Sequence, residues 1–196
     1  MSDLAYSKHN ADRGPSGALW HNCPWGELTG KLGLNYGYVD GDDFMKSVIG
    51  ATTVTAADYT FTQATAGTVL LGSADGGTLV LDCNSTTADQ GVQIQRVQAM
   101  FLPAAGRRMW FECRAKVIDT IDKTQFFAGL SEMDTTIFAT GENSSANHIG
   151  FEMGATVIAS DPGKLQFYGE KAGARGSVLN VKTLVEDTYV KLGFFV

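Results

Sequence analysis

The chain has 196 residues, of which 44% are hydrophobic and 18% are charged, and its formal net charge is −6. This length fits one domain with an appended segment, and the hydrophobic content excludes a chain that is disordered throughout. The negative charge argues against a nucleic-acid partner, because contacts with phosphates require a basic surface. No apolar run approaches the roughly 20 residues that span a bilayer, and the first residues lack the apolar region of a signal peptide. We therefore expect a protein made in a cytoplasm, with no nucleic acid and no membrane as partner.

The first 43 residues differ in composition from the rest. They contain seven of the 23 glycines and two of the four prolines, and no helical or strand period runs through them. We expect an extended, Gly-rich N-terminal arm over residues 1–43 and a folded domain over residues 44–196. The arm is also rich in aromatic and leucine side chains, which need a surface to bury against, either on the chain's own domain or on a partner subunit. Because aromatic side chains dominate the energetics of interfaces, we predict that the interface anchors are Trp20, Trp25, Leu28, Leu32, Leu34, Tyr36 and Tyr38.

Beyond the arm, short β-branched and aromatic runs alternate with turn signals. Strands at this spacing, roughly nine to eleven of them, favour an antiparallel β-sandwich or barrel. The predicted strands are 58–62, 68–71, 78–83, 92–97, 100–102, 107–118, 125–130, 148–153, 164–170, 177–181 and 189–196. Helix is expected to be scarce, with short turns at 119–124 and 134–140.

The run 107–118 gives the clearest pattern. Its apolar residues share one parity, and a period of two places them on one face of a strand: Met109, Phe111, Cys113, Ala115 and Val117. Trp110 has the opposite parity, so its side chain points away from the predicted core and can be covered by the arm. The last residues, 189–196, are mostly apolar, and we expect this strand to pair inside a sheet because unpaired termini fray.

Candidate acidic sites are weak. Glu132 and Asp134 have the acid-x-acid spacing that would place two carboxylates on one strand face, as some β-sandwich glycosidases require, but polar loop residues surround them. Asp40, Asp42 and Asp43 form the densest acidic cluster, which fits a solvated loop better than part of a calcium site.

Soft metal ligands and nucleophiles give no stronger signal. His21 and Cys23 lack the paired spacing of a zinc site, and Cys83 and Cys113 fit reduced, buried thiols. The sequence contains neither a Gly-x-Ser-x-Gly nucleophile motif nor a phosphate-binding loop. The residues therefore predict no enzyme, no cofactor and no metal.

The strand cores resemble a family of structural proteins of tailed bacteriophages. The resemblance covers residues 44–196 and is carried by Asp42-Asp43-Phe44 and by the runs 110–117, 126–130, 148–151 and 189–194. Members are similar to capsid decoration (cement) proteins with a concanavalin-like or jelly-roll sandwich. Glucanases of that fold carry an acid triplet on one strand, which this sequence lacks, so the resemblance implies a structural role.

The resemblance implies a virion protein on the capsid exterior that binds the outer face of the major capsid protein lattice and stabilises it. It also implies a homo-oligomer, either dimer or trimer, since decoration sites lie on symmetry axes. Two alternatives stay open. One is a lectin-like carbohydrate-binding module on a phage tail or fibre, which would use an exposed tryptophan such as Trp110 and could require calcium. The other is a hydrolase with a degenerate acid pair.

Overall fold

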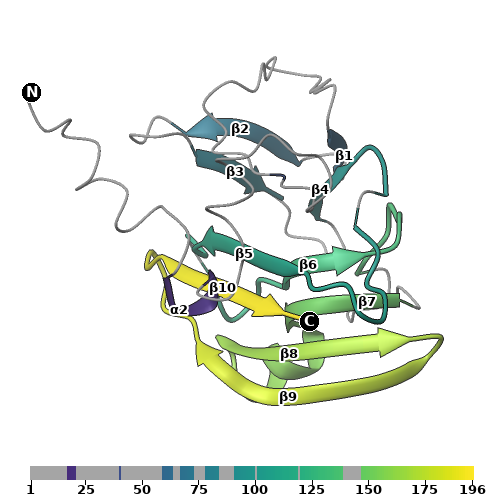
Figure 1. Cartoon of the computed structure of the whole chain (residues 1–196). Coiled ribbons are helices and arrows are strands. Elements are labelled where there is room, and N and C mark those ends of the chain that lie inside the picture. Colours follow the sequence, from purple (N-terminus) through teal and green to yellow (C-terminus); the bar gives the residue numbers. More distant parts are fainter. Residues whose placement is uncertain are drawn as a thin grey trace, which may run out of the picture. The chain divides into compact units, whose positions relative to one another are not determined.

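The computed structural model describes residues 17–20, 40, 59–63, 67–72, 78–83, 91–99, 101–118, 120–138 and 147–196 (Figure 1). These residues form an all-β protein of antiparallel sheets with two short helices, so the predicted fold class is confirmed at this level. The described strands are β1 (Tyr59–Gln63), β2 (Thr68–Gly72), β3 (Thr78–Asp82), β4 (Val92–Arg96), β5 (Trp110–Ala115), β6 (Phe126–Ser131), β7 (Asn147–Met153), β8 (Lys164–Lys171), β9 (Ala174–Thr183) and β10 (Val190–Phe195). The helices are α2 (Gly17–Trp20) and α4 (Ala155–Ser160). None of the helices in the described ranges is long and apolar enough to cross a membrane.

The chain divides into two compact units. The first unit comprises Met1–Gly37, Pro103–Leu130 and Asn147–Val196, and the second comprises Tyr38–Leu102 and Ser131–Ala146. The boundary predicted between residues 43 and 44 lies outside the described residues.

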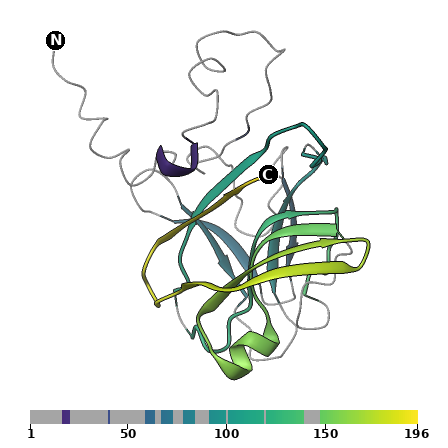
Figure 2. The ribbon, with the colours of Figure 1, turned by 60° about the horizontal axis from the view of Figure 1, so that its bottom comes forward.

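Two sheets make up the first unit. One has four strands in the order β6-β7-β8-β9, and the other pairs β10 with β5. The β10–β5 pair is antiparallel and runs from Val190 opposite Ala115 to Phe195 opposite Trp110. This confirms that the last predicted strand pairs inside a sheet. Figure 2 shows the β8–β9 hairpin, in light green and yellow, at the edge of the four-stranded sheet.

The core of the first unit is formed by side chains from both sheets. Its buried residues are Val117, Phe151, Met153, Leu165, Leu184, Val190, Leu192 and Phe194. Met109, Phe111 and Cys113 pack against this cluster, which confirms the core face predicted by alternation. Phe194 of β10 makes ring contacts with Phe151 of β7 and Phe167 of β8, with centroids 6.2 Å and 5.3 Å apart. Burial of these aromatic rings stabilises the packing of the two sheets, because aromatic side chains remove large areas from water.

The second unit contains two antiparallel strand pairs, β1 with β4 and β2 with β3. On β4, Gln93 and Gln95 alternate with Val92 and Ile94, as predicted for a half-buried strand. These glutamines bind the backbone of the 131–137 loop. Gln95 donates to the carbonyl of Glu132 at 3.2 Å and accepts from the amide of Asp134 at 3.3 Å. The polar face of β4 therefore holds a loop in place.

Several element boundaries differ from the predictions. Residues 101 and 102 belong to no strand, and the predicted long strand over 107–118 is confined to Trp110–Ala115. The predicted strand over 177–181 is longer and begins at Ala174. Helix α4 occupies residues for which the sequence predicts no element, and α2 is a single helical turn within the predicted arm.

Of the two thiols predicted to be buried, Cys83 is exposed at the end of β3, so that prediction is wrong for it, whereas Cys113 is half-buried on β5 and has a raised pKa. Burial first, and then the neighbouring Glu112 carboxylate, raise the pKa of Cys113 from its ordinary 9.0 to about 12. An unfolded chain loses this proton near pH 9 whereas the folded protein keeps it up to about pH 12, so the free energy of unfolding should fall as the pH rises through this range. We expect Cys113→Ala to flatten this decline in urea titrations repeated across that pH range. An unchanged slope would contradict the assignment to Cys113.

Candidate functional site

The first candidate surface is the outer face of the β5–β10 pair, where part of the arm binds. Trp20 of α2 stacks on Trp110 of β5 with ring centroids 6.3 Å apart and an interplanar angle of 22°. Leu19 lies over Gly193 of β10, so closely that a Cβ at position 193 would come within 2.4 Å of the Leu19 Cδ2 atom. Figure 1 shows α2 beside β10. We call this surface the arm-docking face. On it, Trp110 is covered by Trp20, a residue of the same chain.

Replacing Gly193 by alanine should displace α2 from the arm-docking face. The new methyl group would collide with Leu19 and would lie 2.9 Å from the carbonyl oxygen of Phe111, closer than real side chains approach. We expect a changed tryptophan emission spectrum and faster proteolysis near Trp20. Gly176→Ala is the matched control, since the nearest atom to its Cβ is 4.0 Å away. Equal spectra and cleavage rates for the two variants would contradict the docking.

Of the predicted interface anchors, the structure describes Trp20 alone. It is half-buried against Trp110 of its own chain, which is one of the two burial modes that the sequence left open. The other anchors lie outside the described residues: Trp25, Leu28, Leu32, Leu34, Tyr36 and Tyr38.

Two of the candidate acids found in the sequence, Asp40 and Asp134, serve local structure. Asp40 forms an ion pair with Arg96 of β4, and the Arg96 guanidinium also lies 4.1 Å from the centroid of the Tyr59 ring. The Asp134 carboxylate accepts hydrogen bonds from the amide and hydroxyl of Thr136 at 2.7 and 2.9 Å, which closes a turn. Asp42 and Asp43 lie outside the described residues. In the part of the chain that the structure describes, no group of three or more potential metal ligands is found.

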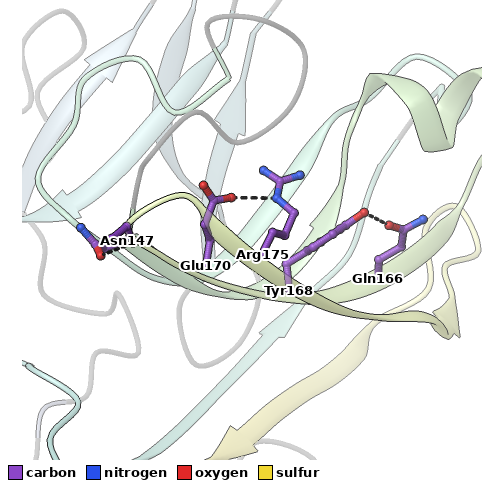
Figure 3. A network of polar contacts seen from close by, with 6 residues as sticks. Asn147, Gln166, Tyr168, Glu170 and Arg175 are labelled. Atoms are coloured by element: carbon purple, nitrogen blue, oxygen red, sulfur yellow. Dashed lines mark hydrogen bonds and ion pairs between the residues drawn. The ribbon is translucent and has the colours of Figure 1, made fainter.

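The second candidate surface is a row of polar side chains on β8 and β9, which we call the polar row (Figure 3). Gln166, Tyr168 and Glu170 alternate along β8 and so share one face of the sheet. The Tyr168 hydroxyl donates to the Gln166 side-chain oxygen. Arg175 of β9 donates from Nε to Glu170 at 2.7 Å, and its guanidinium lies 5.0 Å from the centroid of the Tyr168 ring. The row therefore joins an amide, a phenol, a carboxylate and a guanidinium.

Electrostatics reinforce the polar row. The hydrogen bond to Glu170 raises the pKa of Arg175, burial acts in the opposite direction, and the charges of Glu170 and Glu152 raise it further. Strand β7 places Glu152 opposite Gln166 and His148 opposite Glu170, on the same sheet face. Both of these β7 residues are buried. On this face, Gln166, Tyr168, Glu170 and Arg175 are at least partly exposed and could contact a polar ligand, whereas His148 and Glu152 lie beneath the surface.

The third candidate surface is strand β9 itself. All ten residues of β9 are exposed, and they include Val178 and Leu179, whose exposed fractions are 58% and 59%. Within the described residues β9 pairs only with β8 and forms the edge of its sheet. Long apolar edge strands are ready templates for pairing with another chain. This strand is therefore a candidate protein-binding edge.

Sequence reasoning did not find the polar row or the β9 edge. The alternation of Gln166, Tyr168 and Glu170 is visible in the predicted strand 164–170. Their partners Arg175 and Glu152, however, come from other strands and become neighbours only through sheet register. Exposure of Val178 and Leu179 depends on the position of β9 in the sheet order, which periodicity does not specify. Comparisons of the chain with known protein families, with curated proteins and with solved structures found no match.

Proposed function

We propose that this chain is a virion structural protein, a capsid decoration protein that binds the outer face of the major capsid protein lattice as a dimer or trimer. Its role would be passive and non-enzymatic: binding to the assembled lattice stabilises that state by mass action. The proposal includes an antiparallel sandwich of the jelly-roll or concanavalin-like type. The ring contacts of Phe194 with Phe151 and Phe167, which join β10 to β7 and β8, support this arrangement.

The observation that carries the proposal is the exposed apolar edge strand. An isolated protein that leaves Val178 and Leu179 more than half exposed on one edge strand has a surface suited to being covered in an assembly. The negative net charge supports an exterior position, away from packaged nucleic acid, since like charges repel. The resemblance of the strand-core residues to those of decoration proteins gives the proposal further support.

The test is co-sedimentation of the purified protein with capsids that lack it, followed by electron microscopy. We expect saturable binding and regularly spaced extra density on the capsid exterior. Leu179→Ser should reduce occupancy, whereas Val185→Ser is a matched control, because Val185 is equally exposed but lies outside β9. Failure of the unmodified protein to bind would overturn the decoration role.

A carbohydrate-binding module is the second candidate, and the polar row favours it. Amide, carboxylate and guanidinium groups beside an aromatic ring are the groups that hydrogen-bond hydroxyls and stack on sugar faces. This candidate would use Tyr168, because the ring of Trp110 is already stacked on the ring of Trp20. A glycan array distinguishes the two proposals: saturable binding that is lost in Tyr168→Ala and kept in Tyr189→Ala would favour this alternative. If the array shows no binding, the glycans that it displays are excluded as ligands of this chain.

A further inference from the structure

The β8–β9 turn determines which backbone groups of β9 point outward. Lys171 and Ala174 are opposite each other and are joined by Ala172 and Gly173, whose φ angles are 50° and 80°. A two-residue turn with two positive φ angles is the tight hairpin type, in which the closing residues form a hydrogen-bonded pair. Hydrogen-bonded and non-hydrogen-bonded pairs then alternate along an antiparallel ladder. The backbone N–H and C=O groups of Arg175 and Ser177 therefore point away from β8.

The first half of β9 has few of the features that protect natural sheet edges. Residues 174–178 pair regularly with Phe167–Lys171 of β8. A register shift follows, and Asn180 within it has a φ of 55°, so the bulge that could discourage pairing lies beyond Val178. The nearby cation, Arg175, is bound to Glu170 of β8. A regular stretch of exposed strand without a blocking bulge or proline is open to strand addition.

We propose that β9 pairs antiparallel with β9 of a second copy of this chain, with the two-fold axis at Ser177. The two four-stranded sheets would then form one continuous sheet across the dimer. This inference deepens the proposed function and rests on its homo-oligomer part, because it assigns the surface through which two copies associate.

Backbone parity and charge agree with this register and exclude one centred between Val178 and Leu179. Backbone N–H and C=O groups that point away from β8 in one copy must meet the same kind of groups in the other copy. With the axis at Ser177, Ser177 pairs with the partner subunit's Ser177, and Arg175 lies opposite the partner subunit's Leu179. A register centred between Val178 and Leu179 would place backbone groups that point away from β8 opposite backbone groups that point toward β8. It would also place Arg175 opposite the partner subunit's Lys182, and like charges directly opposite each other are destabilising.

Coverage of apolar surface also favours a second copy in the Ser177 register. Val178 would lie opposite the partner subunit's Gly176, which has no side chain to obstruct it. The Leu179 side chain would contact the aliphatic part of Arg175 from the partner. The contact is one pair of strands, which is smaller than a stable interface requires. We therefore expect a dimer whose population rises with protein concentration.

Crosslinking at the axis tests the register. In a dimer of Ser177→Cys, the two introduced cysteines, one from each copy, would be directly opposite each other as a hydrogen-bonded pair, with Cα atoms about 5.5 Å apart. A short bismaleimide should join them into a covalent dimer. Thr183→Cys is the matched control on the same strand, because its two copies would lie roughly 40 Å apart at about 3.3 Å per residue. Cys83 is an exposed native thiol, so all variants are made in a Cys83→Ser background, which itself gives the baseline. Equal crosslinking of the two variants would overturn the register.

Sedimentation analysis tests the pairing without a crosslinker. Ser177→Pro removes a backbone N–H that points away from β8, so the β8–β9 ladder should survive, since proline is tolerated at edge positions of this kind. We expect concentration-dependent dimers for the unmodified protein and a loss of dimer for Ser177→Pro, with unchanged circular dichroism. A monomer at every concentration, or a dimer that persists in folded Ser177→Pro, would overturn the proposal. If Ser177→Pro does not fold, the crosslinking comparison decides. Capsid binding is measured separately, so failure of one proposal is distinguishable from failure of the other.

Discussion

Phe194→Ala is expected to lower the free energy of unfolding by about 3–5 kcal/mol, the range for removing a buried aromatic side chain. Phe194 is 7% exposed. Its ring stacks on Phe111 with centroids 5.1 Å apart and contacts Phe151 and Phe167 of the other sheet. Truncation would leave a cavity between the two sheets, which rigid strands fill poorly. Urea denaturation followed by circular dichroism measures the loss.

Phe195 provides the matched control for this variant. It is the next residue of β10, its side chain points to the opposite face, and it is 61% exposed. Phe195→Ala removes the same atoms from the same strand, yet we expect a loss below about 1 kcal/mol, because little area is buried there. Similar losses for the two variants would contradict the assignment of the core.

Gly150→Ala is the second variant expected to have a large effect. Gly150 of β7 faces Gly129 of β6, and a Cβ at position 150 would lie 2.6 Å from the Ala128 carbonyl oxygen and 2.8 Å from the Gly129 Cα atom. These are backbone atoms of a neighbouring strand, so relieving the collision requires the two strands to separate. We expect a destabilisation of about 3 kcal/mol, near the upper end for overpacking. The change is measured as a lower melting temperature and a lower urea midpoint.

Gly169→Ala is the control for this collision. Gly169 lies on β8 in the same sheet, and the nearest atom to its Cβ would be Ile149 Cγ1 at 4.0 Å, an ordinary contact. Neither glycine has a positive φ, so strain at the residue itself is the same in both variants. A melting temperature for Gly150→Ala equal to that of Gly169→Ala would show that β6 and β7 do not approach so closely.

Local pattern predicted most of the strands of the first unit. The alternation from Met109 to Val117 predicted the core face of β5. Helix α4 was missed because its six residues, Ala-Thr-Val-Ile-Ala-Ser, are too short to show a helical period and include β-branched residues typical of strands.

Little of the candidate sites was predictable. Trp20 was identified as an anchor because an aromatic residue in a Gly-rich arm requires a surface. The contact of Leu19 with Gly193 depends on the approach of two segments more than 170 positions apart, and no local signal encodes it. The same holds for Arg175 and Glu170, which the sheet register places opposite each other.

The sequence by itself determined the all-β class, the parity of the core residues on β5 and the pairing of the last strand, because these follow from side-chain alternation and from the need to bury apolar residues. Tertiary structure alone decided which strand lies at the sheet edge, which polar side chains form the polar row and where the arm helix binds. Those features depend on strand order and register, which are set by contacts between residues distant in the chain.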